Sequence, residues 1–170
     1  NFGSDDFFAD IEIIHLANTF LKKILPDSKI TLYLNSLGTR ENLKDYKKIL
    51  SKYFNQNKNL LSIDSIDKIN TNPLRILDSK NIENKEVINN CPKLIDLLSK
   101  SDFNNYDEIK KCLIDLDIPV FEDLNLVRGL DYYCHTVFEF KTNDIGSQDT
   151  LIGGGRYNGL IKTLGGKDIP

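Results

Sequence analysis

The sequence contains no methionine, no tryptophan and only three cysteines. Cys91, Cys112 and Cys134 are far apart and form no Cys-x-x-Cys pair, so they indicate neither a disulfide framework nor a zinc site. We therefore expect a reducing, cytoplasmic setting and no metal held by the protein. No apolar run approaches the roughly 18 residues that span a membrane, and we expect no membrane contact.

The chain also lacks an excess of positive charge. Its formal net charge is -3, which gives no overall attraction to nucleic acid, so an RNA contact would need a local patch. One basic cluster comprises Lys44, Lys47, Lys48 and Lys52, for which a solvated helix face is favoured over an RNA contact. The absence of methionine, with Asn1 as the first residue, predicts that the 170 residues are a piece of a longer polypeptide.

The first third of the chain predicts a helix, a strand and a second helix. Ser4, followed by two aspartates, is typical of a helix start, and Pro26 ends the helix. Its apolar stripe comprises Ile13, Leu16, Ala17, Phe20 and Ile24. Residues 30–34 are β-rich and predict a short buried strand. From position 39 to 119 the apolar spacing is helical, which predicts an all-helical insertion domain between segments 1–38 and 120–170 of a second domain.

After Pro119 the apolar period changes to two. Residues 124–130 and 136–142 predict strands, 143–146 predict a hairpin turn, and 149–152 predict the returning strand. The strands are bunched rather than alternating with helices. We therefore predict an α+β fold with an antiparallel sheet.

Two stretches near the end of the chain carry unusual chemistry. Residues 126–133 place Arg128, Tyr132 and Tyr133 where a buried strand would carry aliphatic side chains. Arg128 suits a phosphate or carboxylate, but an equally good interpretation is a structural ion pair with Asp131 or Glu139.

The second stretch begins with the three glycines Gly153, Gly154 and Gly155 and continues to Tyr157. Such a glycine run is more often a tight turn than a phosphate cradle, and the tyrosines could be core aromatics. The residues alone indicate a pocket for an anion or a polar ligand.

The motifs in these stretches resemble those of the histidyl-tRNA synthetases. Leu-Val-Arg-Gly-Leu-Asp-Tyr-Tyr at 126–133, followed by Thr-Val-Phe-Glu-Phe and then Gly-Gly-Gly-Arg-Tyr-Asn-Gly-Leu at 153–160, is similar to the two histidine-specific motifs of that family. Residues 3–6, 34–38 and 72–80 also resemble bacterial members. The resemblance implies the antiparallel sheet of a class II synthetase, flanked by helices, with the insertion domain reaching toward the tRNA.

The resemblance also implies roles for individual residues. Arg128 would face the α-phosphate of ATP, which is expected with Mg²⁺, and Tyr132 and Tyr133 would line the pocket for L-histidine. The glycines at 153–155 would make room for the amino acid, and Tyr157 would join them. The full-length family member would be a homodimer that acts on ATP, L-histidine and histidine tRNA.

The family also carries motifs that are not found here. Further ATP-binding motifs and an anticodon-binding domain are expected outside these 170 residues, so we expect the isolated chain to be inactive. Asn158 stands where the family more often has aspartate, and no role is assigned to it or to His135. The alternative is a non-catalytic protein: a synthetase-like regulatory subunit, or a module that binds RNA or protein.

One geometric expectation follows from the spacing. In a regular strand Arg128 and Tyr132 would share a face while Tyr133 pointed to the other. Because the family resemblance needs all three at one pocket, we expect Gly129 to permit a bend, with Tyr133 facing Arg128 and Tyr157.

Overall fold

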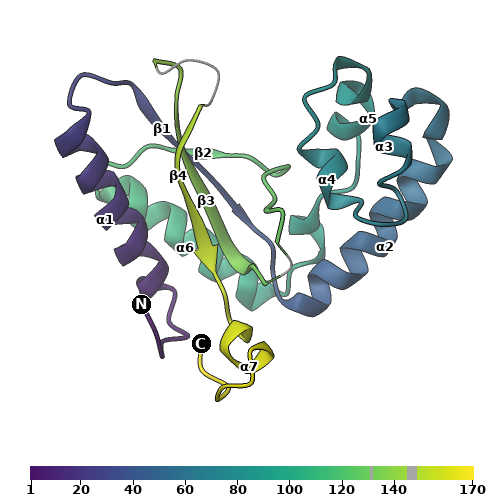
Figure 1. Cartoon of the computed structure of the whole chain (residues 1–170). Coiled ribbons are helices and arrows are strands. Elements are labelled where there is room, and N and C mark those ends of the chain that lie inside the picture. The colour runs from purple at the N-terminus through teal and green to yellow at the C-terminus, as the bar shows by residue number, and fades with distance from the viewer. Residues whose placement is uncertain (131, 145–148) are drawn as a thin grey trace.

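The sheet of this protein places antiparallel strands beside one parallel strand. The computed structural model describes residues 1–130, 132–144 and 149–170. Within them the strand order is β2-β1-β3-β4 (Figure 1). The strands are β1 (Ile30–Ser36), β2 (Val120–Glu122), β3 (Cys134–Thr142) and β4 (Thr150–Arg156). β3 runs antiparallel to β1 and β4, whereas β2 lies parallel to β1. The predicted α+β class is confirmed, and the parallel pair is possible because a long helical segment connects β1 to β2.

The two faces of the sheet differ in polarity. Leu32 of β1 lies opposite Phe140 of β3, and both are buried. Their neighbours Tyr33 and Glu139 are also paired across the strands, and they point to the other face because side chains alternate along a strand. One face is therefore apolar, and the other, here called the polar face, carries ionisable side chains.

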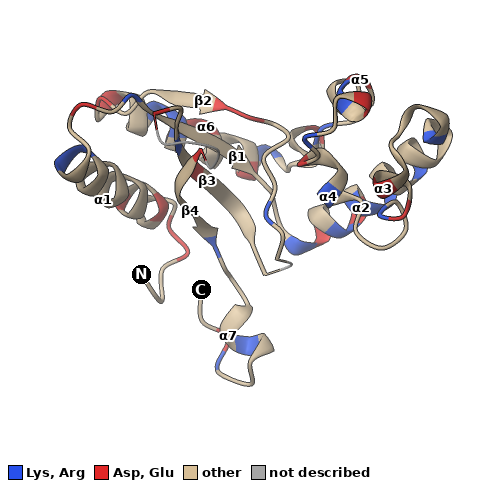
Figure 2. Cartoon of the chain, turned by 45° about the horizontal axis from the view of Figure 1, so that its top comes forward, with Lys and Arg blue, Asp and Glu red and all other residues tan. Residues whose placement is uncertain are grey.

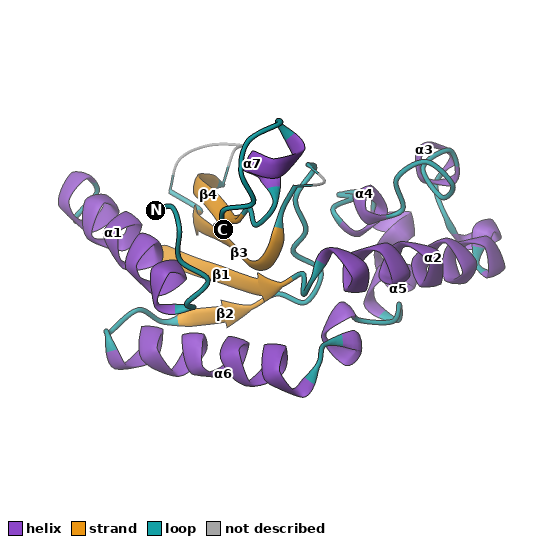
Figure 3. Ribbon diagram, turned by 90° about the horizontal axis from the view of Figure 1, so that it is seen from below, coloured by secondary structure: helices purple, strands orange, loops and turns teal. Residues whose placement is uncertain are grey.

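Two long helices cover the apolar face. These are α1 (Phe8–Ile24) and α6 (Lys100–Asp115), and α6 runs alongside β1 and β2 (Figure 3). The helices bury a common core with the sheet, to which they contribute Ile11, Ile14, Leu21, Tyr106, Ile109 and Leu113. α6 lies within the range 39–119 predicted as an insertion, yet it packs with this core. The boundary of the insertion stays a prediction, and the packing favours ending it before Lys100.

The first helix is present, but it begins later than the sequence indicates. α1 starts at Phe8 rather than at Ser4, because the carboxylate of Asp6 accepts a hydrogen bond from the Phe8 amide at 3.0 Å. The apolar stripe identified from the spacing lies mostly on the outward face, where Leu16 is 64 % exposed. α1 therefore carries two apolar faces, and the one that packs on the sheet includes Ile14, which is fully buried.

The insertion is helical, as predicted for most of its length. It contains α2 (Arg40–Gln56), α3 (Ile63–Ile66), α4 (Leu74–Leu77) and α5 (Lys85–Asn89), with 3₁₀ turns at Lys58–Leu60, Ile82–Asn84 and Leu94–Leu97. Thr39 caps α2, since its hydroxyl accepts the Asn42 amide while the Asn42 side chain accepts the Thr39 amide. Acidic and basic side chains are interspersed along these helices (Figure 2).

The core of the insertion continues beneath the polar face. Leu43, Leu50 and Phe54 of α2 belong to the same buried cluster as Tyr133 and Val137. The helical segment and these strand residues therefore share one buried core, and the division of the chain into an insertion and a second domain stays a prediction.

The predicted strand at 124–130 is wrong, because this segment is a loop. The backbone of Leu126 forms its hydrogen bonds within a turn and with a side chain rather than with a neighbouring strand. The Leu126 amide donates to the Asp123 carbonyl at 2.9 Å, and the Asn35 side chain donates to the Leu126 carbonyl at 2.9 Å.

Part of the predicted hairpin turn at 143–146 lies outside the described residues. A short helix, α7 (Leu160–Thr163), follows β4. The two chain ends lie together, and the Gly3 amide donates to the Pro170 carbonyl at 2.9 Å (Figure 1). None of the described helices has both the length and the apolarity needed to cross a lipid bilayer.

Candidate active site

Arg128 projects from the loop after β2 onto the polar face of the sheet. Its Nη1 is paired with Oε1 of Glu139, so the ion pair considered from the sequence is present. The other oxygen of Glu139 receives Lys141 Nζ at 3.1 Å and the Thr150 hydroxyl at 3.2 Å. The alternative partner, Asp131, lies outside the described residues. Arg128 and Glu139 thus form part of a charged group of side chains on adjacent strands.

The guanidinium of Arg128 lies against Gly153 of β4. A Cβ atom at Gly153 would stand 2.8 Å from Arg128 Nη1 and 3.0 Å from its Nη2, closer than real contacts allow. Gly153 is also the cross-strand partner of Glu139. The missing side chain therefore leaves the space that the guanidinium occupies.

Three tyrosines pack together beside Arg128. The rings of Tyr132 and Tyr133 are stacked at 4.9 Å, and the ring of Tyr157 meets them edge-on at 5.1 and 4.7 Å. The hydroxyls of Tyr133 and Tyr157 are 3.1 Å apart, and burial raises the pKa of Tyr157. The guanidinium carbon of Arg128 is 5.5 Å from the centre of the Tyr133 ring. The expected meeting of Tyr133 with Arg128 and Tyr157 is confirmed.

Gly154 and Gly155 are constrained by the fold rather than by Arg128. A Cβ at Gly154 would be 2.7 Å from the Phe138 ring, and one at Gly155 would be 2.4 Å from the Thr136 carbonyl oxygen. Each glycine of the run therefore admits a different neighbour. The predicted tight turn is not found here, since all three lie within β4.

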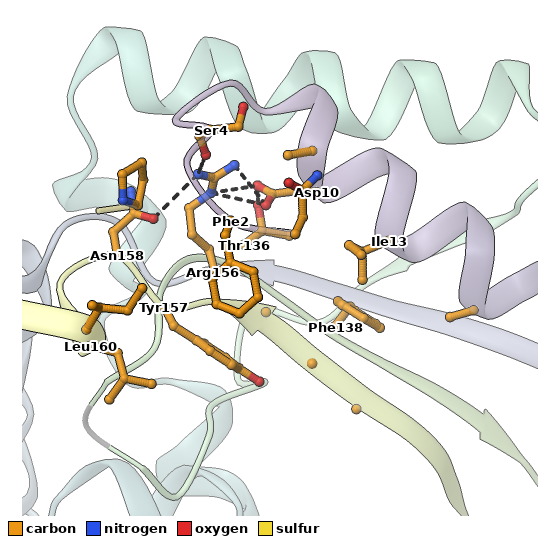
Figure 4. A pocket seen from close by; sticks show the side chains of 18 of the residues that line it. Phe2, Ser4, Asp10, Ile13, Thr136, Phe138, Arg156, Tyr157, Asn158 and Leu160 are labelled. Atoms are coloured by element: carbon orange, nitrogen blue, oxygen red, sulfur yellow. Dashed lines mark hydrogen bonds and ion pairs between the residues drawn. The ribbon is translucent and has the colours of Figure 1, made fainter. Parts of the chain in front are cut away.

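A cavity of about 380 Å³ borders the glycine run on the side of α1 (Figure 4). Gly153, Gly154, Gly155 and Tyr157 line it, together with residues of α1 and of both chain ends. Arg128, Tyr132 and Tyr133 are not among the lining residues. Gly153 and Tyr157 therefore belong both to this cavity and to the contacts around Arg128 and the tyrosines.

The motif at 153–160 contains a second arginine, Arg156, for which the sequence indicated no role. Arg156 Nε donates to Asp10 Oδ1 at 3.1 Å, and its Nη1 donates to the Ser4 carbonyl at 2.8 Å (Figure 4). Its Nη2 donates to the Asp6 carbonyl at 2.7 Å. Asp10 also accepts the Thr136 hydroxyl at 2.7 Å. These contacts, here called the Arg156 network, join the end of β4 to the start of α1. No sequence signal pointed to them, because Arg156 and Asp10 are 146 positions apart.

The two unassigned residues lie near this network. Asn158 donates to the Asp5 carboxylate at 3.0 Å and accepts from Arg156 Nη1 at 3.5 Å. His135 adopts a left-handed backbone with φ 48°, and burial lowers its pKa. Both therefore belong to the junction between the N-terminal loop and the sheet.

The insertion contributes a carboxylate to the surroundings of Arg128. Asp78 ends α4, and burial raises its pKa, with a further contribution from the charge of Glu139. The charges of Lys141 and Arg128 act in the opposite direction. Asp78 is thus within electrostatic reach of the polar face, which the sequence did not indicate.

Comparison with known proteins decides the family. The model of the histidyl-tRNA synthetase family matches residues 1–170, the whole chain. The chain belongs to the histidyl-tRNA synthetase family. The histidine--tRNA ligases of Prochlorococcus marinus (strain AS9601) and Ehrlichia canis (strain Jake) are 46 % and 44 % identical over 99 % of this chain. The chain spans 39 % and 41 % of those synthetases, about two fifths of their length.

Solved structures agree with this membership. The apo histidyl-tRNA synthetase of S. aureus matches 99 % of this chain with a TM-score of 0.71 and 33 % identity, over 40 % of its own length. An ATP phosphoribosyltransferase regulatory subunit/histidyl-tRNA synthetase from Bacillus halodurans matches with a TM-score of 0.60 at 19 % identity, over 47 % of that chain. The second likeness shows a shared fold.

Proposed function

We propose that this chain is the part of a histidine--tRNA ligase that holds the histidine and the α-phosphate of ATP. The main support for this proposal is the position of Arg128, which lies against Gly153 of β4 and beside the ring of Tyr133. A fixed cation, hydroxyl groups and a strand without side chains meet there. This combination suits a substrate that has both a phosphate and a polar side chain.

The proposed reaction is the activation of histidine. A carboxylate oxygen of histidine attacks the α-phosphorus of ATP, the bond from that phosphorus to the bridging oxygen breaks, and pyrophosphate leaves with the electron pair. Negative charge on the α-phosphoryl oxygens grows in the transition state. Arg128 would stabilise that charge, since a guanidinium keeps its positive charge and donates in a fixed geometry. The histidine would then be transferred from the adenylate to its tRNA.

The tyrosines would recognise the amino acid. Tyr132, Tyr133 and Tyr157 bring three phenol groups together, and a phenol hydroxyl can both donate to and accept from an imidazole nitrogen. An amino acid without ring nitrogens would leave these hydroxyls without a partner and would bind more weakly. The glycines at 153–155 would leave room for the backbone of the bound histidine.

Further components of the reaction are also part of the proposal. We propose that Mg²⁺ arrives with ATP. We propose a homodimer acting in the cytoplasm, in which the insertion meets the tRNA.

The proposal is tested by Arg128→Ala in the complete gene product. Loss of a comparable electrostatic group lowers the turnover number roughly a hundred- to a thousandfold, and we expect this loss in histidine-dependent ATP–pyrophosphate exchange. Lys111→Ala, which removes an exposed ion pair on α6, is the control and should retain wild-type exchange. Wild-type exchange by the Arg128 variant would contradict the assigned role.

The wild-type protein distinguishes the alternatives. We expect exchange activity from the complete gene product and none from the isolated 170-residue chain. No exchange by the complete product would instead support a non-catalytic regulatory subunit, and exchange by the isolated chain would show that it contains the whole ATP site.

A further inference from the structure

We propose that Glu139 and Gly153 are positioning residues for Arg128, which they hold in the orientation that meets the α-phosphate. This inference rests on the proposed function. It adds Glu139, which does not itself touch the substrate, and it gives Gly153 a second role besides the room that it leaves for histidine. Both act on the guanidinium of Arg128. Glu139 forms an ion pair with it, and Gly153 leaves the space that it occupies.

Arg128 needs such support because its own backbone is in a loop. A long side chain on a loop samples many rotamers, and ordering it costs up to about 2 kcal/mol. If that ordering took place only in the transition state, it would reduce the stabilisation that Arg128 provides. Contacts that exist before the substrate arrives remove this cost, and a misplacement of about 1 Å can lower a rate a hundredfold.

Glu139 is itself held firmly. It lies in the middle of β3, its side chain is 13 % exposed, and each of its oxygens has partners. Oε1 is paired with Arg128, while Oε2 receives Lys141 and Thr150. A carboxylate fixed at both oxygens can fix the nitrogen that it binds, and it leaves the other donors of the guanidinium for a second acid such as a phosphate.

The charge of Lys141 explains how Glu139 can hold Arg128 without cancelling its attraction for an anion. Lys141 Nζ is 3.1 Å from Glu139 Oε2, so two cations share one carboxylate. The three side chains together carry one net positive charge. The phosphate would therefore meet an arginine that is oriented by a carboxylate within a group that remains cationic.

The position of Gly153 supports the proposed orientation of Arg128 independently of Glu139. Among the three glycines, it is the one at which an added Cβ would meet Arg128, at 2.8 Å from Nη1. At Gly154 the obstacle would be an aromatic ring, and at Gly155 a backbone carbonyl. A methyl group at position 153 would therefore move the end of the arginine side chain and leave the backbone in place.

The first experiment compares Glu139→Ala and Glu139→Gln in the complete gene product by ATP–pyrophosphate exchange. We expect Glu139→Ala to lower kcat about a hundredfold with little change in the KM for histidine. Glu139→Gln keeps a hydrogen-bond acceptor of the same shape and should recover part of the loss. Glu122→Ala is the matched control, since Glu122 is also a strand glutamate paired with a lysine, Lys110, but lies on β2. It should retain wild-type kcat.

The second experiment is a double-mutant cycle with Arg128→Ala. A residue that acts only through Arg128 has no further effect once Arg128 is gone, so Arg128→Ala with Glu139→Ala should be as active as Arg128→Ala alone. Gly153→Ala should lower kcat much more in the wild-type background than in the Arg128→Ala background, where only its effect on the room for histidine remains. Equal losses in both backgrounds would overturn the positioning role and indicate a general effect on folding.

The outcomes separate this inference from the proposed function. If Arg128→Ala has wild-type exchange, the proposed function fails. If Arg128→Ala is inactive but Glu139→Ala and Gly153→Ala have wild-type kcat, the proposed function stands and the positioning role is wrong. Melting temperatures of all variants close to that of the wild type would show that the activity losses arise in the site.

Discussion

Arg128 and Arg156 both lie at β4 but differ in their exposure and in the number of their partners. Arg156 is 7 % exposed, and its donors are directed at the Asp10 carboxylate and at two backbone carbonyls. Arg128 is 24 % exposed and is paired with one carboxylate. A guanidinium whose donors all face the protein joins parts of the fold, whereas one held at a single edge can still bind an anion. The partners of the side chain, and not the residue type, separate a structural arginine from a functional one.

The largest effect should come from breaking the Arg156 network. Arg156→Ala would leave the Asp10 carboxylate, which is 12 % exposed, without its cation. Removing one member of a buried pair costs about 3–5 kcal/mol of unfolding free energy. Urea denaturation of Arg156→Ala and Arg128→Ala compares their unfolding free energies, and we expect a much smaller loss of unfolding free energy for Arg128→Ala. Equal losses would contradict the division between the two arginines.

The next effect concerns neighbouring glycines. Gly155→Ala would place a methyl group 2.4 Å from the Thr136 carbonyl oxygen, so we expect a loss of about 1–3 kcal/mol in unfolding free energy. Gly153→Ala meets only the movable end of Arg128 and should cost less than about 0.5 kcal/mol. Thermal denaturation of both variants checks this. A larger loss at 153 than at 155 would show that Gly153 serves the fold.

A smaller effect is expected at the tyrosines. Tyr157→Phe removes the contact between the Tyr133 and Tyr157 hydroxyls, which are 3.1 Å apart. Because the Tyr157 hydroxyl would also hydrogen-bond the imidazole of histidine, the loss of that bond, worth about 1 kcal/mol, should raise the KM for histidine about fivefold while the KM for ATP stays unchanged. Steady-state exchange kinetics of the complete gene product measure both constants. An equal rise in the two would place Tyr157 outside the histidine pocket.

The smallest effect should be a dependence of stability on pH at His135. Burial lowers the pKa of His135 below its usual 6.5. The charge of Arg156 lowers this pKa further, whereas the carboxylates of Asp102, Asp10 and Asp5 act in the opposite direction. The unfolded chain then binds the proton more tightly, so the stability contribution is present above about pH 6.5 and declines as the pH falls below it.

The matched variant for this prediction is His135→Asn. Asparagine tolerates the left-handed backbone at φ 48° and does not titrate. We expect His135→Asn to reduce the decline in unfolding free energy between pH 7 and pH 5. An unchanged decline would assign it to other groups.

Local patterns in the sequence were enough to predict several elements. The apolar spacing of Leu43, Tyr46, Leu50, Tyr53 and Phe54 predicted α2, and all of these are buried except Tyr53, which is partly buried. The alternation at 136–142 predicted most of β3. These elements are determined by the spacing of the apolar side chains that are buried, and this spacing can be read from residues close together in the sequence.

Other features depended on distant residues and could not be predicted. The segment 124–130 is rich in strand-forming side chains, but its backbone bonds go to a turn and to Asn35. The Arg156 network joins residues separated by most of the chain. For Arg128 the sequence left two interpretations equally open, and the structure shows the ion pair with Glu139, while the phosphate-binding role stays a proposal. The role of Gly153 became visible only through its contact with the guanidinium.

The buried cluster that joins the insertion to Tyr133 has a consequence for experiments that shorten the chain. Leu50 and Phe54 of α2 are fully buried in the cluster that contains Tyr133 and Val137. A deletion of α2 to α5 would open this buried cluster to water as well as remove the proposed surface for tRNA. Loss of aminoacylation in such a deletion would therefore report on the proposed histidine pocket as much as on tRNA. A graft of the helices from a relative would have to preserve the apolar contacts beneath Tyr133.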